Sequence, residues 1–222
     1  MESDITILYY TANRISDYFA NNVRRHLLEM SKGIPIISVT KKPMDFGDKN
    51  ICVGNTEHTV YNIYRQILIG ALAAKTDWVA CCEDDCLYNE EHLQYRPDKF
   101  AYNINRWNVN RKYFFYRKRA GMCMGIAPRK LMVETLEKRF EKYPIPLKGR
   151  EAHRGWGEPG RCEKNIGLPE VAMETFTTNT PTLTFSHRPS MGGIRRVLRR
   201  DTVKQNLSPY GNARSFWKQY HG

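Results

Sequence analysis

Three consecutive carboxylates, Glu83, Asp84 and Asp85, directly follow an apolar run at residues 78–82. The run has the length of one buried strand, and three adjacent negative charges at its end repel one another unless a cation compensates them. Carboxylate oxygens suit a hard divalent ion and leave coordination positions for water or phosphate. Since side chains alternate along an extended chain, we expect Glu83 and Asp85 on one face and Asp84 on the other. The alternative is a solvated acidic turn after a core strand.

The order of apolar patterns predicts a parallel α/β sheet around this strand. In the first half, the patterns predict helices at residues 17–30 and 57–74 and strands at residues 4–10, 34–39, 51–53 and 78–82. In the second half, they predict strands at residues 100–107, 113–117, 120–127 and 182–187 and a helix at residues 128–142. Ligands bind beyond the carboxyl ends of parallel strands. The loop at residues 11–14 and the acidic triplet should therefore face one crevice.

Length and composition favour a single cytoplasmic domain. The chain has 222 residues and is 41% hydrophobic and 26% charged, as is ordinary for a globular protein. No apolar run approaches the roughly 18 residues of a membrane span, and the acidic start at residues 1–4 is unlike a signal peptide. The six cysteines are expected to be reduced thiols. A zinc site formed by Cys82, Cys86 and a distant histidine is the alternative.

Basic residues cluster in two stretches of a chain whose formal net charge is +12. Residues 106–130 hold eight Lys or Arg and no acid, and residues 194–222 hold seven against the single Asp201. Such clustering favours a polyanionic partner, which could be nucleic acid, an acidic glycan or an anionic membrane surface. General solubility together with pairing to a diphosphate ligand is the alternative.

Polar residues on the first loop and the second helix add to the pattern. The loop carries Thr11, Asn13 and Arg14, and the helix carries Asn62 and Arg65. Together with the strand that enters the acidic triplet, they resemble a GT-A glycosyltransferase, and the resemblance extends over residues 5–187. It implies a single Rossmann-like GT-A domain with a mostly parallel central sheet flanked by helices. The implied organisation is a GT-A domain (1–193) with a nucleotide-sugar-binding half (1–99) and an acceptor-binding half (100–193), then a basic C-terminal segment (194–222).

In that family a DXD-type motif binds Mn²⁺ or Mg²⁺, which clamps the diphosphate of a nucleotide sugar, here expected to be a UDP-sugar. The resemblance implies Asp85 as a metal ligand and Glu83 and Asp84 as donor-binding residues. It adds four further donor-binding residues: Thr11, Asn13, Arg14 and Arg65. The triplet departs from the family pattern because it opens with Glu, whose longer side chain could still reach the sugar or the ribose.

A second loop combines a large flat side chain with acids. Trp156 lies between two glycines and is followed by Glu158 and Glu163. The loop is similar to the GWGxED-like loop of galactosyltransferase-type GT-A enzymes, where the Trp packs on the donor sugar and an acid is the catalytic base. The resemblance implies Glu158 as the base, with Glu163 as the second choice, and a retaining enzyme would need neither. The alternative is a surface loop with a half-buried Trp.

The predicted strand at residues 182–187 ends in His187, and Arg188 follows it. In many GT-A enzymes a C-terminal histidine completes the metal shell, and the loop after it closes over the diphosphate. The resemblance therefore implies His187 as a metal ligand and Arg188 as a donor-binding residue. A structural histidine at a strand end is the alternative.

The basic stretches suggest the acceptor. Phosphates neutralised by Lys and Arg release counterions, so DNA accounts for charge that a neutral sugar would not. We expect transfer to the hydroxyl of a modified base, such as a hydroxymethylpyrimidine, as in the DNA-glucosylating enzymes of bacteriophages; a phage-encoded enzyme would work in the host cytoplasm. The basic residues expected to contact DNA are Arg117, Lys118, Arg119, Arg195, Arg196, Arg199 and Arg200.

Other functions stay open at this point. A glycosyltransferase could instead act on a cell-surface or capsular glycan, and a nucleotidyltransferase also uses a metal and a nucleotide on a related sheet. A non-catalytic nucleic-acid-binding protein could stack bases on Tyr113, Phe114, Phe115 and Trp217. The acidic triplet argues against this last reading, because carboxylates at the centre of a DNA-binding face would repel phosphate.

Overall fold

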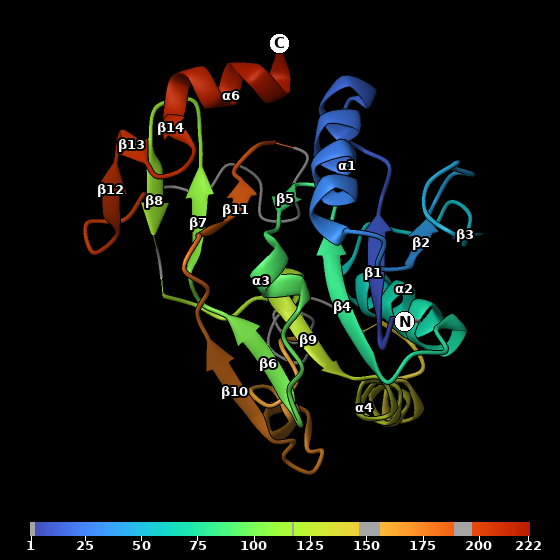
Figure 1. Ribbon diagram of the computed structural model, residues 1–222. Coiled ribbons are helices and arrows are strands. Elements are labelled where there is room, and N and C mark those ends of the chain that lie inside the picture. Colours follow the sequence, from blue (N-terminus) through green and yellow to red (C-terminus); the bar gives the residue numbers. More distant parts are fainter. Residues whose placement is uncertain (1–2, 117, 147–155, 189–196) are drawn as a thin grey trace.

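The computed structural model describes residues 3–116, 118–146, 156–188 and 197–222. Within these residues, a seven-stranded sheet forms the larger layer, in the order β10-β6-β9-β4-β1-β2-β3 (Figure 1). Its strands are β1 (Ile5–Thr11), β2 (Ile36–Thr40), β3 (Lys49–Cys52), β4 (Trp78–Glu83), β6 (Phe100–Asn103), β9 (Gly125–Pro128) and β10 (Met173–Phe176).

Most strand pairs in this sheet are parallel. β1 pairs in parallel with both β2 and β4, β2 with β3, and β10 with β6. Only β9 runs against its neighbours β4 and β6 within the described residues. The predicted class, an α/β fold with a mostly parallel central sheet, is confirmed. Residues before and after position 100 contribute strands to the same sheet.

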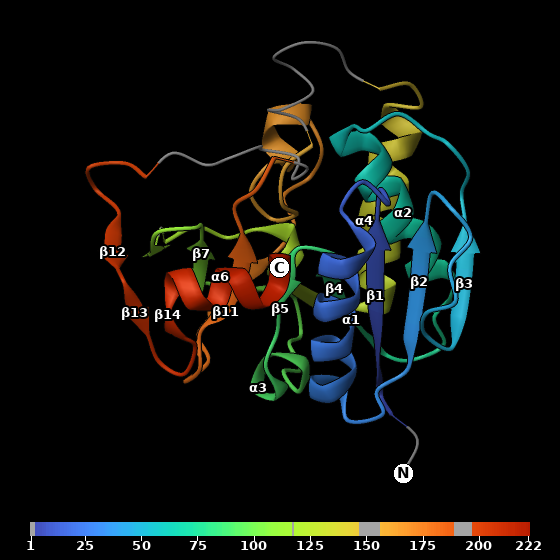
Figure 2. The same cartoon turned by 90° about the horizontal axis from the view of Figure 1, so that it is seen from above.

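Helices cover both faces of the sheet. Figure 2 shows α1 (Asp17–Ser31) on one side and α2 (Val60–Ala73) with α4 (Arg129–Lys142) on the other. Alternate β1 residues separate accordingly: Ile7 belongs to the apolar cluster of α1, and Leu8 to that of α2 and α4. Among the described residues, no helix has the length and apolar character needed to cross a membrane. The cytoplasmic location stays a prediction.

Local signals fix where the two site-forming helices begin and how closely α2 approaches the sheet. Ser16 caps α1 by accepting a hydrogen bond from the Phe19 amide, and Thr59 caps α2 in the same way from Asn62. A Cβ on Gly70 would lie 3.2 Å from a Leu8 methyl group, so the absence of a side chain lets α2 pack tightly on β1.

A second, five-stranded sheet lies beside the first, in the order β12-β8-β7-β11-β5. Its strands are β5 (Cys86–Leu87), β7 (Arg106–Val109), β8 (Phe114–Tyr116), β11 (Thr182–Phe185) and β12 (Thr202–Lys204). A short helix, α3 (Glu90–Leu93), follows β5. β11 lies between β7, to which it is parallel, and β5, to which it is antiparallel.

Two predicted strands of the second half are wrong in detail. Residues 100–107 form β6 and β7, which belong to different sheets, because the Asn103 side chain accepts from the Asn105 amide and turns the chain between them. Residues 122–124 form a 3₁₀ turn ahead of β9, in which the Met124 amide donates to the Gly121 carbonyl. The predicted helix at residues 128–142 agrees with α4 to within one residue.

The described part of the C-terminal segment is packed against the rest of the molecule. β12 pairs with β8, the β13–β14 hairpin (Asn206–Leu207 and Gly211–Asn212) follows, and α6 (Ala213–His221) ends the chain. α6 contacts α1 and buries Phe216 and Trp217 with Phe19 and Phe185 in one aromatic cluster. The pairing of β12 with β8 also brings the two basic stretches of the sequence side by side.

His92 in α3 generates a prediction about stability. Its ring is fully buried between Tyr88 and Phe176, and neither ring nitrogen has a hydrogen-bond partner among the described residues. Burial lowers the pKa of His92 to about 3. Below the ordinary histidine pKa of about 6.5, His92 is therefore protonated in the unfolded chain but stays neutral in the folded chain. The free energy of unfolding falls as the pH drops.

His92→Phe should remove this loss, flattening the fall in unfolding free energy by up to about 1.4 kcal/mol per pH unit between pH 6 and 4. Urea unfolding of the wild type and the variant at several pH values measures it. His26→Gln is the comparison: burial also lowers the pKa of His26, but its ring nitrogen lies 2.7 Å from the Tyr88 carbonyl oxygen, so the profile should flatten less. Parallel pH profiles for wild type and His92→Phe would contradict the prediction.

Candidate active site

A cleft lies at the carboxyl ends of β1, β2 and β4, where parallel strands place a ligand site. It encloses about 550 Å³ of space, including its open mouth. The loop after β1, the start of α2, the acidic triplet and His187 after β11 all contribute walls. The cleft is lined by Tyr10, Thr11, Ala12, Arg14, Ile15, Lys41, Glu57, His58, Thr59, Asn62, Ile63, Gln66, Glu83, Asp84, Asp85 and His187.

All three carboxylates of the triplet line this one cleft. β4 ends at Glu83, and the chain turns through Asp84 and Asp85 into β5. The expectation that Asp84 faces away is therefore wrong, because strand alternation stops where the turn begins. The turn concentrates three acidic groups in one place.

Hydrogen bonds from β1 hold two of these carboxylates. The Tyr10 hydroxyl donates to Glu83 Oε1 at 3.0 Å, and the Thr11 hydroxyl donates to Asp84 Oδ2. Burial, with the charge of Cys123 and then of Asp85, raises the pKa of Glu83 well above its ordinary value. Burial and the charge of Asp85 raise the pKa of Asp84 to about 7. The triplet, in which Asp85 is buried and the other two residues are half-buried, therefore has an electrostatic preference for a nearby cation.

Asp85, in the turn between β4 and β5, lies beside His187, which follows β11. Asp85 Oδ2 lies 3.5 Å from His187 Nε2, and the two residues are 6% and 8% exposed. The Phe185 amide donates to the Asp85 carbonyl at 2.8 Å and so fixes the distance between these two segments of the chain. His187 Nε2 is buried without a hydrogen-bond partner among the described residues. A carboxylate oxygen beside an imidazole nitrogen fits the ligand preferences of Mn²⁺, and the oxygens also suit Mg²⁺.

The opposite wall of the cleft is basic. Arg14 is exposed there, and Lys41 Nζ donates to the carbonyls of Thr56 and Glu57 at 2.6 and 3.0 Å. Burial and the neighbouring Arg14 charge lower the pKa of Lys41. His58 Nε2 is buried here without a hydrogen-bond partner among the described residues. The cleft therefore combines an acidic end with a basic end.

Two polar side chains organise the loops, and sequence reasoning had missed one of them. Asn13, in left-handed backbone, accepts from the Lys41 and Lys42 amides at 2.9 and 3.1 Å, so it ties two loops together and does not line the cleft. Gln66 Nε2 donates to the Thr11 and Val39 carbonyls at 3.0 and 2.7 Å and joins the ends of β1 and β2. The sequence signal for this function was that Gln66 is a polar residue on the otherwise apolar, buried face of α2.

Arg65 and Arg188 lie at the edges of this arrangement. Arg65 is exposed and lines a neighbouring hollow together with Thr56 and Ile69, outside the lining of the cleft. Asn62 and Gln66 line both hollows and form the wall between them. Arg188 is exposed and directly follows the buried His187.

Trp156 is a core residue in this structure. It is 3% exposed, and its ring lies 4.8 to 5.8 Å from the rings of Phe140, Tyr61 and Tyr64. These aromatic neighbours come from α2 and α4, far from residue 156 in sequence, which is why the glycines on either side did not reveal the packing. Trp156 does not line the cleft.

Glu163 is occupied by a buried ion pair. It is 2% exposed and receives Arg139 Nε at 3.1 Å, a second contact from Arg139 Nη2, and the Gly160 amide at 2.7 Å. With both carboxylate oxygens engaged, it is poorly placed for proton transfer. Glu158 has a side chain that is 15% exposed, pairs with Arg161 at 3.2 Å, and stands outside the cleft lining.

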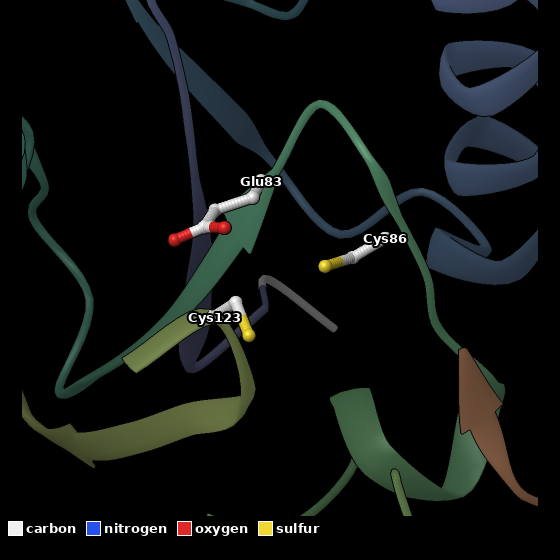
Figure 3. A group of neighbouring side chains, drawn as sticks. All are labelled: Glu83, Cys86 and Cys123. Atoms are coloured by element: carbon white, nitrogen blue, oxygen red, sulfur yellow. The ribbon is translucent and has the colours of Figure 1, made fainter. Parts of the chain in front are cut away.

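Glu83 also belongs to a second group of possible metal ligands, together with two cysteines. Figure 3 shows Glu83 at the end of β4, Cys86 after the turn and Cys123 from the segment before β9. Their ligand atoms lie within 4.8 Å of one another, but buried Arg106 donates to Cys123 Sγ at 3.3 Å and supplies a cation already. The group contains Cys86 and not Cys82, so it differs from the zinc alternative drawn from the sequence.

Some of the predicted DNA-binding residues gather at the β8–β12 edge. A hollow of about 930 Å³ is lined there by Tyr116, Lys118, Arg119, Arg200, Asp201 and Thr202. Arg199 is exposed beside it. Arg117, Arg195 and Arg196 lie outside the described residues.

No protein-family model matches the chain, and no curated protein sequence matches it. Its fold is similar to that of solved glycosyltransferases. TarS 1–349 from S. aureus gives a TM-score of 0.51 at 9% identity, over 83% of this chain and 61% of that one. A glycosyltransferase involved in the glycosylation of the major capsid of PBCV-1 gives 0.49 at 10% identity, over 82% and 93%. A mannosyltransferase from Pyrobaculum calidifontis, in complex with GDP-Man and Mn²⁺, gives 0.45 at 10% identity, over 85% and 58%.

The similarity to the TarS fragment shows the class of fold alone. The chain spans 61% of the TarS fragment, which is less than two thirds of its length. What the site does must be argued from its own residues.

The Arg139–Glu163 pair generates a prediction. Glu163→Gln leaves the guanidinium buried beside a neutral amide, so we expect a loss of about 3–5 kcal/mol in unfolding free energy. Urea unfolding at pH 7 measures it. The double variant Arg139→Met, Glu163→Met removes both charges and should recover most of the loss. A single variant as stable as the wild type would contradict this reading of the pair.

Proposed function

We propose that this chain is a metal-dependent glycosyltransferase of the GT-A type that uses a nucleotide-sugar donor, expected to be a UDP-sugar. The observation that carries the proposal is the buried Asp85–His187 pair, in one cleft with two further carboxylates and a basic opposite wall. If the carboxylates had no ligand to bind, we would expect them to lie apart and to be solvated separately. A metal bound to a diphosphate satisfies both ends of this cleft at once.

Donor binding divides between the two ends of the cleft. Asp85 and His187 would hold Mn²⁺ or Mg²⁺, which when bound offsets the charge that gathers on the departing nucleoside diphosphate. Glu83 and Asp84 are held by Tyr10 and Thr11 and would accept hydrogen bonds from donor hydroxyl groups. On the opposite wall, Arg14 and Lys41 face the phosphates or the nucleoside, and Arg188 stands beside the metal pair.

The acceptor hydroxyl must lose its proton as it attacks the sugar. Glu158 is our proposed base for an inverting reaction, because Glu163 is enclosed by Arg139. For Glu158 to act, it must leave its ion pair with Arg161. A retaining reaction would leave Glu158 without this function.

We further propose DNA as the acceptor, with the sugar transferred to the hydroxyl of a hydroxymethylated base. What supports this is the joining of Lys118 and Arg119 with Arg200 along the β8–β12 edge, where exposed cations from two distant segments form one surface. Such a surface suits a phosphate backbone. A cell-surface or capsular glycan is the competing acceptor.

Asp85→Asn provides the test of the metal site. The amide keeps the shape of the side chain but loses the charge, so Mn²⁺ should no longer strengthen UDP binding. Calorimetric titration of UDP with Mn²⁺ and with chelator measures the effect, and His187→Gln should behave in the same way. Glu137→Gln, at an exposed acid on α4, is the matched control. If the wild type binds UDP equally well with chelator, the proposed metal-dependent function is wrong.

Glu158→Gln tests the base. Turnover should fall by at least about a hundred-fold with the affinity for donor little changed, because the amide cannot accept a proton. Steady-state transfer assays and UDP titration measure the two quantities. Arg161→Gln breaks the same ion pair but keeps the carboxylate, so it separates proton transfer from loss of the pair. Full turnover by Glu158→Gln would exclude Glu158 as the base.

A further inference from the structure

A second cleft adjoins the proposed donor cleft and shares Ile15 and His187 with it. It encloses about 1490 Å³, including its open mouth. In Figure 1, α6 extends from the β7–β8 side of the molecule toward α1, and these elements form its walls. The cleft is lined by Ile15, Ser16, Phe19, Asn110, Arg111, Lys112, Tyr113, Ser186, His187, Arg188, Trp217 and His221.

Flat aromatic side chains make up much of the lining of this second cleft. The Trp217 ring stacks on His221 at 3.8 Å between centroids and 7° between planes. The Phe19 ring packs 4.5 Å from His221 and 4.9 Å from His187. Phe19 and Trp217 are themselves 1% and 7% exposed, so the flat surface that a ligand can reach in this cleft is offered by the half-buried rings of Tyr113 and His221.

The rim of the second cleft is cationic. Arg111 and Lys112 are exposed at the tip of the β7–β8 turn, and Arg188 is exposed after β11. Asn110 accepts from the Lys112 and Tyr113 amides at 2.9 and 3.0 Å, so the turn is held in shape. No carboxylate is found among the described lining residues. The charge on the rim therefore complements an anionic ligand.

His221 gives the second cleft a directional polar group. Its Nδ1 lies 3.1 Å from the Trp217 carbonyl oxygen, which can only accept, so Nδ1 carries the proton. In the neutral ring, Nε2 is then an acceptor, and it is buried without a hydrogen-bond partner among the described residues. A ligand that brings a donor, such as an exocyclic amine or a hydroxyl, would satisfy it.

We propose that the second cleft receives the acceptor base of DNA after it leaves the duplex stack. This inference rests on the proposed function and names the place where the acceptor binds. The base stacks on the half-buried rings of Tyr113 and His221, and its flanking phosphates lie on Arg111, Lys112 and Arg188. A neutral sugar could stack on these rings but would not use the three cations, whereas a nucleotide uses both.

The shared wall places the two substrates for reaction. The hydroxymethyl oxygen of the base forms a bond to the anomeric carbon of the sugar, and the bond from that carbon to the diphosphate oxygen breaks. Its electron pair leaves with the nucleoside diphosphate, and the hydroxyl proton passes to the proposed base, Glu158, which lines neither cleft and must leave Arg161 to reach the hydroxyl. A base in the second cleft reaches the donor past His187 and Ile15, the residues that both clefts share.

The first test reverses charge on the rim. Arg111→Glu with Lys112→Glu should weaken binding of a short duplex carrying one 5-hydroxymethylcytosine at least tenfold. The slope of log K against log salt should fall by about two, because two phosphate contacts are lost. Fluorescence anisotropy over a salt series measures both. Lys130→Glu with Lys138→Glu makes the same charge change on exposed positions of α4 and should have the smaller effect. Equal effects of the two pairs would overturn the proposal.

The second test locates the base directly. A duplex with 5-iodouracil at the target position is irradiated with the wild-type protein, and the cross-linked peptide is identified by mass spectrometry. Attachment to Tyr113, which is half-buried, is expected, and Tyr113→Phe should keep cross-linking while Tyr113→Leu reduces it. Attachment outside the second cleft, or transfer to oligosaccharide or a lipid phosphate but not to DNA, would overturn the proposal. Manganese-dependent UDP binding by the wild type, measured in parallel, tests the proposed function separately.

Discussion

The crowding of three carboxylates at the end of β4, with Asp85 buried and Glu83 and Asp84 half-buried, is the constraint on which the site depends. Like charges in a region of low polarity repel strongly, and the pKa of Glu83 and the pKa of Asp84 are both raised as a result. The fold accepts this cost because Tyr10 and Thr11, at the end of the adjacent parallel strand, donate hydrogen bonds to two of the groups. An arrangement held in this way is prepared for a cation before the cation arrives.

The second sheet positions His187, the second of the two proposed metal ligands. β4 continues through the acidic turn into β5, and β5 pairs with β11, which leads to His187. The hydrogen bond from the Phe185 amide to the Asp85 carbonyl fixes this junction at the site itself. The position of His187 therefore follows from strand pairing between segments about a hundred residues apart. Packing of α6 against α1 covers the outer side of the same junction.

Sequence patterns predicted the parts of this structure that local chemistry controls. The strand into Glu83, the first helix and the parallel first half of the sheet all follow from short-range signals. The patterns did not predict that Asp84 shares the cleft. Three consecutive acids are equally polar in a strand and in a turn, so their sequence does not show where the strand ends. They also gave no sign of the partners of Trp156 and Glu163. Those partners lie on α2 and α4, and only tertiary packing brings them together.

His187 connects two environments that differ in chemistry. On one side it faces the carboxylate of Asp85, and on the other it borders an aromatic cleft with a cationic rim. A cation held by the first environment would restrain the imidazole and, through its contacts with Phe19 and His221, the wall of the second. Occupancy of the donor cleft would then shape the acceptor cleft before the acceptor arrives. The coupling needs no moving domain, since one buried ring belongs to both walls.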